Sequence, residues 1–163
     1  MKNINLGQTL SILANAGVIA SLIFVGIQVQ QGATATRSAA VLQLKDSWVQ
    51  LNLAQATSVD LADAFHDIDQ HGWDGANYRS TSLVEGFIRT LFHNWSNAYY
   101  QYQNGALDAN QWGAFLREAR WNTTDPRIRR VWHDWNHVYD DSFRELMDGL
   151  FAETDTGSAS AGN

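Results

Sequence analysis

The stretch LSILANAGVIASLIFVGIQV, Leu10 to Val29, decides the fold of this chain, because it is long, apolar and free of charged side chains. No acidic or basic residue occurs between Lys2 and Arg37. A helix of this length rises about 30 Å, which matches the hydrocarbon core of a bilayer. A helix also satisfies its own backbone hydrogen bonds, so it can cross lipid unaided. We therefore predict a transmembrane helix here.

Two alternatives for this segment stay open. The first is a cleaved signal peptide, since Lys2 provides a positive start and Ala33-Thr34-Ala35 has the small-x-small form of a cleavage site. The apolar stretch is long for a signal peptide, which favours a membrane span. The second alternative is a buried or interfacial helix in a soluble oligomer.

Small residues within the apolar stretch predict a face for helix pairing. Gly17 and Ser21 lie four positions apart, as do Ala16 and Ala20. This spacing lets two helices approach closely in lipid, and Asn15 can donate a hydrogen bond across such a contact. We expect a protein partner or a second copy of the chain to bind through these residues.

The charges that flank the apolar stretch give only a weak indication of its orientation. Lys2 and the amino group flank one end, and Arg37 and Lys45 flank the other. The positive-inside rule barely separates the two ends. We expect a single-pass protein in contact with membrane lipid, with its C-terminal domain in the cytoplasm.

Helical spacing of apolar residues continues after the anchor. It predicts a helix over residues 34–57, separated from the anchor only by Gly32, whose cost of about 1 kcal/mol does not guarantee a break. Whether the two form one helix stays open. Leu61, Phe65 and Ile68 mark a short helix that begins near Ser58 or Asp60. The segment QHGWDGANYRSTS, Gln70 to Ser82, predicts a loop, and Ser82 with Glu85 has the spacing of a capping box that begins the next helix.

The helix predicted over residues 83–104 has the clearest pattern, and Gly105 is expected to end it. Its apolar stripe consists of Leu83, Phe87, Leu91, Trp95, Ala98 and Tyr102, widened by Ile88, Phe92 and Tyr99. All of these positions recur at helical spacing, so they are expected to face the core.

Three further helices are predicted. Asp108 and Gln111 can cap the first, and Asp125 followed by Pro126 can begin the second. Their expected core residues are Trp112, Phe115, Leu116 and Ala119; then Ile128, Val131, Trp132, Trp135, Val138 and Tyr139; and finally Phe143, Leu146, Met147, Leu150 and Phe151. The predicted fold is all-α, with a membrane anchor over residues 1–33, a helical bundle over 34–152 and a disordered tail over 153–163.

Composition excludes several classes of function. The chain has seven Trp, seven Phe and five Tyr, enough to build a core from few side chains. It has no Cys, so disulfides, Cys-based zinc sites and thiol nucleophiles are ruled out. The formal net charge of -6 disfavours nucleic-acid binding, which needs a basic face to neutralise phosphates.

Several short motifs resemble a widespread group of short bacterial membrane-anchored helical proteins of unknown function. The matching pieces include SLIFVGIQVQQ, the pair Tyr99-Tyr100, Gly105 with Leu107-Asp108, and Trp112. The resemblance implies an anchored helical domain in the bacterial inner membrane. It implies no established activity and no catalytic residues.

Three groups of residues are candidates for chemistry. His133 and His137 have the spacing of metal ligands on a helix, although solvated histidines are the simpler interpretation. Arg127, Arg129 and Arg130 begin a helix and are candidates for an anionic headgroup, although a solvated run of charges is the simpler interpretation. The tyrosines near residue 100 are candidates for a ligand pocket, although a helical aromatic stripe usually forms core.

The leading hypothesis is a non-enzymatic membrane-anchored interaction protein, either a homo-oligomer or an accessory subunit of a membrane complex. The alternative is a small-ligand or metal-binding sensor domain in a helical bundle. We find no nucleophile with a matching base and no glycine-rich phosphate loop, so we assign no catalytic, cofactor or metal residues and no cofactor. An enzyme would need His66, His93 or carboxylates to converge in a pocket.

Overall fold

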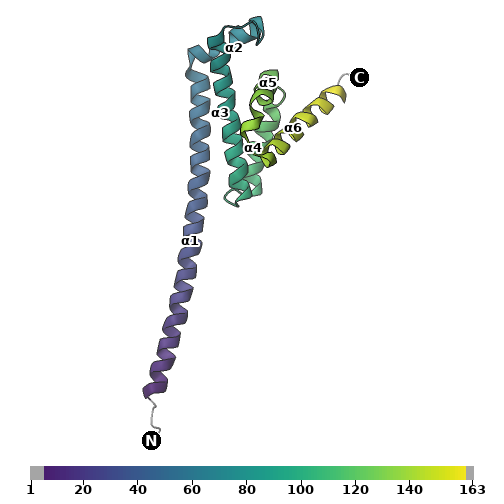
Figure 1. Cartoon of the computed structure of the whole chain (residues 1–163). Coiled ribbons are helices and arrows are strands. Elements are labelled where there is room, and N and C mark those ends of the chain that lie inside the picture. Colours follow the sequence, from purple (N-terminus) through teal and green to yellow (C-terminus); the bar gives the residue numbers. More distant parts are fainter. Residues whose placement is uncertain (1–5, 161–163) are drawn as a thin grey trace. The chain divides into compact units, whose positions relative to one another are not determined.

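The computed structural model describes the backbone of residues 6–160 and the side chains of residues 10, 11 and 13–155. Within this range the chain forms six α-helices, a short 3₁₀ helix and no strand, which confirms the all-α class (Figure 1). It divides into two compact units, Met1–Ala39 and Ala40–Asn163. The predicted boundary between residues 33 and 34 falls inside the first unit.

The first unit consists of the N-terminal part of α1, Leu6–Thr57. The helix contains Gly32 without a break, as its small predicted cost allows. Hydroxyl groups along this part bond within the helix: Thr34 and Thr36 each donate to the carbonyl four residues earlier, at 3.0 Å. The hydroxyl groups of Thr34 and Thr36 therefore need no hydrogen-bond partner outside the helix.

The second unit contains the end of α1 and all later helices. These are α2 (Val59–His71), α3 (Tyr78–Gln103), α4 (Ala109–Asn122), α5 (Pro126–Trp135), the 3₁₀ helix η1 (Asn136–Val138) and α6 (Asp141–Ser160). Helix α3 packs against α2, α4 and α5, and α4 packs against α6. Figure 1 shows α3 alongside the end of α1, and the buried Leu44 of α1 packs with Ala98 of α3. Helix α3 is therefore the centre of the bundle.

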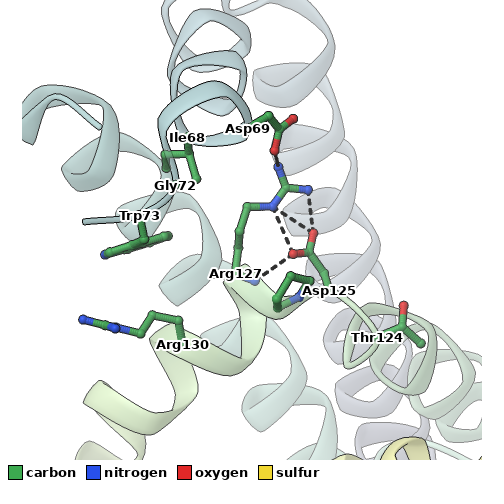
Figure 2. Close-up of a pocket in the computed structure, with 9 residues that line it drawn as sticks. Ile68, Asp69, Gly72, Trp73, Thr124, Asp125, Arg127 and Arg130 are labelled. Carbon is green, nitrogen blue, oxygen red and sulfur yellow. Dashed lines mark hydrogen bonds and ion pairs between the residues drawn. The ribbon is translucent and has the colours of Figure 1, made fainter. Parts of the chain in front are cut away.

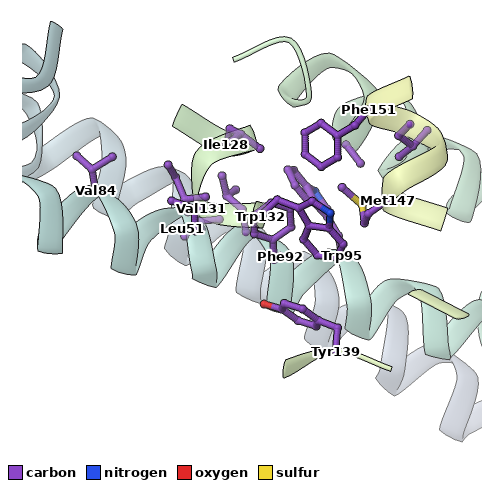
Figure 3. Close-up of a cluster of buried hydrophobic side chains, with 14 of the residues drawn as sticks. Leu51, Val84, Phe92, Trp95, Ile128, Val131, Trp132, Tyr139, Met147 and Phe151 are labelled. Atoms are coloured by element: carbon purple, nitrogen blue, oxygen red, sulfur yellow. The ribbon is translucent and has the colours of Figure 1, made fainter. Parts of the chain in front are cut away.

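Phe92 on α3 lies at the middle of the aromatic core. Its ring centroid is 5.0 Å from that of Trp132 and 5.4 Å from that of Trp95. Figure 3 shows these three rings gathered with Phe151 and Met147 of α6. The indole N–H of Trp132 donates to a carboxylate oxygen of Asp148 at 2.7 Å, so the polar group of this core ring has a partner.

The start of α3 differs from the prediction. The helix begins at Tyr78, so Tyr78 to Ser82 are not loop, and the capping box of Ser82 with Glu85 is wrong. Asn77 is the N-cap, and its side chain accepts from the Arg79 N–H at 2.8 Å. Asp67 of α2 also accepts the Asn77 N–H at 2.9 Å, which fixes the chain where it enters α3. This tertiary contact has no signature in the local sequence.

The predicted end of α3 before Gly105 and the predicted start of α5 after Asp125 are confirmed. Gly105 has a φ of 70°, and the Ala106 N–H donates to the Gln101 carbonyl at 2.8 Å, which closes α3 in a Schellman motif. Asp108 and Gln111 form the predicted capping box of α4. Asp125 caps α5, with Pro126 in its first turn.

Two details of the predicted core are wrong. On α3 the buried face includes Val84, which is fully buried, whereas Leu83 and Tyr102 are more than a third exposed. The buried face is broader than one stripe because α3 contacts α1, α2, α4 and α5. Val138 is also exposed, because α5 ends at Trp135 and the 3₁₀ turn points this side chain outward.

The predicted disordered tail is wrong as far as Ser160, because α6 continues to that residue. Glu153 accepts a hydrogen bond from Arg120 at 2.9 Å, and Asp155 pairs with Arg129 at 2.8 Å. These pairs tie the last turns of α6 to α4 and α5. Residues 161–163 of the predicted tail, and Lys2 at the other end, lie outside the described residues.

Replacement of Phe92 by alanine tests the core. Phe92→Ala is expected to lower the free energy of unfolding by about 3–5 kcal/mol, because it leaves a cavity among large rings. The matched control is Trp121→Ala, since Trp121 is 78% exposed and its loss should change stability by less than about 0.5 kcal/mol. Unfolding of the detergent-solubilised full chain, followed by near-UV circular dichroism, measures both. Equal losses in the two variants would contradict the core described above.

Candidate functional site

The most distinctive surface of the molecule is the apolar part of α1 in the first unit. Helix α1 is long and apolar enough to span a membrane by length and composition, and its apolar window is entirely unburied. Its large side chains are 46% to 67% exposed: Leu10, Leu13, Val18, Ile19, Leu22, Ile23, Phe24, Val25, Ile27 and Val29. Monomeric soluble proteins rarely expose an apolar surface of this extent, and such surfaces are typical of sites where lipid or another protein binds.

The predicted helix-pairing residues all lie exposed on this segment: Asn15, Ala16, Gly17, Ala20 and Ser21. A side-chain carbon built at Gly17 would meet no atom within 4 Å, so this position is open to a close approach. The Ser21 hydroxyl donates to the Gly17 carbonyl at 2.8 Å. Ser21 is therefore small enough for a close contact between helices, and its hydroxyl is already hydrogen-bonded within its own helix.

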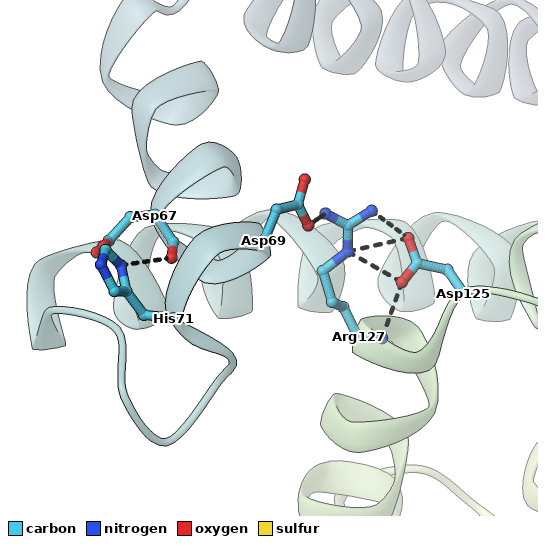
Figure 4. A network of polar contacts seen from close by, with 5 residues as sticks. All are labelled: Asp67, Asp69, His71, Asp125 and Arg127. Carbon is cyan, nitrogen blue, oxygen red and sulfur yellow. Dashed lines mark hydrogen bonds and ion pairs between the residues drawn. The ribbon is translucent and has the colours of Figure 1, made fainter.

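Arg127, one of the three headgroup candidates, lies between two carboxylates (Figures 2 and 4). Its guanidinium donates to Asp125 at 2.7 Å and to Asp69 of α2 at 2.9 Å. Its backbone N–H also donates to the Asp125 side chain at 2.8 Å, completing the N-cap of α5. The hydrogen bond to Asp125 is the main cause that raises the pKa of Arg127 further. Arg127 therefore joins α5 to α2.

Arg129 and Arg130 are paired in the same way. Arg129 binds Asp155 of α6 at 2.8 Å, and Arg130 binds Asp74 at 3.5 Å and Asp134 at 3.2 Å. The three arginines thus have five aspartates as partners: Asp69, Asp74, Asp125, Asp134 and Asp155. An anionic headgroup would have to displace these carboxylates, so the geometry favours a role in joining helices.

A cavity of about 650 Å³ lies beside this cluster, between α2 and the start of α5. Trp73, Ile68 and Pro126 form its apolar wall, and Arg127 and Arg130 form its polar wall. Figure 2 shows Arg127 directed towards Asp69 and Asp125. Because Arg127 and Arg130 bind aspartates, neither side chain directs an unpaired charge into the cavity. The cavity is open and mostly apolar.

The histidine pair does not form the arrangement that its spacing suggested. His133 lies on α5 and its side chain is 85% exposed, whereas His137 lies in η1 and stacks against Trp135. Because α5 ends between them, they do not share a helix face. In the part of the chain that the structure describes, no group of three or more His, Asp or Glu side chains could hold a metal ion. His66 and His93 are exposed and lie on different helices.

The tyrosines near residue 100 pack with other rings rather than around a cavity. Tyr99 contacts Trp112 and Phe143 at centroid distances of 5.8 and 5.9 Å. The Tyr100 hydroxyl donates to Asp140, which also accepts the Phe143 N–H at 3.0 Å. Burial is the largest cause that raises the pKa of Tyr100 to about 12, and the hydrogen bond to Asp140 is the second. The bond from Tyr100 is also the main cause that lowers the pKa of Asp140.

Sequence reasoning missed the partners of the arginines. Asp69 and Arg127 are 58 positions apart, and no local pattern connects them. The capping role of Asp125 was visible, because an aspartate before a proline is typical of a helix start. The Tyr100–Asp140 contact likewise joins residues 40 positions apart.

Comparison of the chain with protein-family models, with curated proteins and with solved structures finds no match. The class of the protein is defined by its own architecture: an all-α chain in which an exposed apolar helix precedes a helical bundle.

Replacement of Tyr100 by phenylalanine tests the contact that positions α6. At pH 7, Tyr100→Phe is expected to lower the midpoint of thermal unfolding, because Asp140 loses a hydrogen-bond donor. The lowered pKa of Asp140 means that its contribution is present above its ordinary pKa of 3.8 and is lost as the pH falls through the lower folded-state value. The difference between variant and wild type should therefore shrink as the pH falls below about 4.

Tyr78→Phe is the matched control, since Tyr78 is 85% exposed. Tyr78→Phe should leave the midpoint of thermal unfolding unchanged at pH 7 and at pH 3. A Tyr100→Phe effect of the same size at pH 7 and at pH 3 would show that packing, and not the bond to the Asp140 carboxylate, is lost.

Proposed function

We propose that this chain is a non-enzymatic membrane-anchored interaction protein, acting as a homo-oligomer or as an accessory subunit of a membrane complex. The observation that carries the proposal is the exposed apolar surface of α1, joined in sequence to a bundle whose interior is filled by aromatic side chains. The exposed surface of α1 needs lipid or protein to cover it. The helical bundle is a stable folded domain in which we recognise no reaction centre.

The energetics favour lipid as the main cover. Removal of one large apolar side chain from water contributes about 1.5–3 kcal/mol, and ten such side chains are exposed here along one helix. They occur on all sides of the helix, as a lipid-facing helix requires, rather than on one stripe. The small residues around Gly17 then offer a place where one such helix can approach another within the membrane.

The proposal includes a single pass through a bacterial inner membrane, with the bundle in the cytoplasm. Support for the orientation comes from Arg37 and Lys45, which follow the apolar segment on the side of the bundle. The negative net charge of -6 makes nucleic acid an unsuitable partner for the bundle.

The cavity beside Trp73 is the one observation that favours the second candidate, a small-ligand sensor. Its volume of about 650 Å³ falls in the range of small-molecule sites, and its wall is largely apolar. A ligand for this cavity would be apolar or uncharged, because Arg127 and Arg130 already bind aspartates. A bound metal has no comparable support.

Arginine substitutions in the apolar segment test the anchor. The double variant Ile19→Arg with Ile23→Arg places two charges near the middle of the span, each costing about 2.5–3.5 kcal/mol on an insertion scale. We expect the variant to be lost from the alkali-resistant membrane fraction, where the wild type should be found.

Val59→Arg with Val138→Arg is the matched control, because both valines are exposed in the second unit. This control should remain in the membrane fraction. If the Ile19 and Ile23 variant resists alkaline extraction as well as the wild type does, the proposed anchor is wrong.

A further inference from the structure

The last turns of α1 carry a second apolar surface, separate from the membrane segment. Leu42, Val49 and Leu53 are 61%, 54% and 51% exposed, although all three lie in the second unit. The opposite side of the same stretch is buried in the bundle, where Leu44, Trp48 and Leu51 pack. The bundle therefore uses one side of this stretch and leaves an apolar side uncovered.

The exposed residues have the spacing of a coiled coil. Val49 follows Leu42 by seven positions, and Leu53 follows Val49 by four. Alternating steps of three and four define the a and d positions of a heptad, which place Leu42, Val49 and Ala56 at d and Asp46 and Leu53 at a. These five exposed residues form what we call the α1 seam.

Two charges occur at informative positions in this heptad. Asp46 occupies an a position inside the seam, and Lys45 occupies the adjoining g position. Both are exposed, and neither forms an ion pair with another side chain in the described part of the chain. In a parallel coiled coil the residue at g lies beside the following a residue of the partner helix. Two copies in register would thus place each Lys45 beside the Asp46 of the other copy.

We propose that the α1 seam binds the α1 seam of a second copy of this chain, in a parallel and in-register pair closed by two reciprocal Lys45–Asp46 ion pairs. This inference rests on the proposed function, because anchoring in one membrane gives both helices the same direction. Anchoring also confines the copies to a plane and raises their effective concentration, which a short seam needs for pairing.

The charge pattern selects a second copy over an unrelated apolar partner. A purely apolar partner would bury Asp46 without a counter-charge, which is strongly unfavourable. A second copy supplies that counter-charge from Lys45 and matches the leucine and valine positions with identical ones. The polar a position then fixes the register of the pair, as single polar residues do in coiled coils.

Single-cysteine cross-linking in native membranes tests the pairing, because the natural chain has no Cys. Leu42→Cys, Val49→Cys and Leu53→Cys, each made in the full chain, should give disulfide-linked dimers on mild oxidation. Ser47→Cys and Ala54→Cys are exposed on α1 but off the seam, so they should give no dimer. Equal cross-linking at seam and off-seam positions, or none at any, would overturn the inference.

A charge exchange tests the ion pairs. In the Leu53→Cys background, Asp46→Lys should abolish the disulfide-linked dimer, because four cations would then meet. Adding Lys45→Asp to Asp46→Lys should restore it. Val49→Asp should abolish the dimer, whereas Val59→Asp, at a valine that is 73% exposed outside the seam, should not. Persistence of the dimer in Asp46→Lys, or failure of the exchange to restore it, would contradict the Lys45–Asp46 pairs.

Failure of this inference is distinguishable from failure of the proposed function. A chain that resists alkaline extraction and assembles in membranes, but shows no seam periodicity in cross-linking, would overturn only the seam. A chain that alkali releases from membranes would overturn the anchor and, with it, the parallel arrangement of the pair.

Discussion

The physical constraint on which this molecule depends is the exposure of its N-terminal apolar helix. Ten large apolar side chains on α1 stand free of any cover within the described structure, and water is a poor solvent for all of them. The backbone hydrogen bonds of the helix are formed within it, and the hydroxyls of Ser21 and Thr34 donate to carbonyls four residues earlier. The large side chains of this segment are best covered by an apolar medium. The proposed membrane anchor is based on this exposed surface rather than on any single motif.

The bundle has the opposite character, because its large apolar side chains are mostly buried against one another. Phe92 and Trp132 gather the aromatic residues around α3, and the polar contacts lie at the periphery. There, Arg127 joins α5 to α2 through Asp125 and Asp69, and Asp140 joins the start of α6 to α3 through Tyr100. These groups have the residue types of a binding site, but each charge has a partner within the chain. We interpret them as contacts that hold the helices in place.

Much of the fold was predictable because it is encoded locally. The apolar segment, the Schellman end at Gly105 and the caps at Asp108 and Asp125 each depend on a few adjacent residues. The errors arose where distant residues decide the outcome. Asp67 fixes the entry to α3 five residues earlier than expected, and Arg120 and Arg129 hold the last turns of α6 in place of a disordered tail. The pairing of Arg127 with Asp69 could not be predicted either, since only the packing of α5 on α2 brings them together.

The central claim is that the whole chain is membrane-anchored and acts in an assembly. Extraction of the protein from native membranes in mild detergent, followed by native mass spectrometry, tests it most directly. The account predicts an assembly with defined stoichiometry, formed of two or more chains or of this chain with a partner protein. Each chain in it should retain the apolar N-terminal segment. A bare monomer, or a chain cleaved after Ala35, would contradict the account.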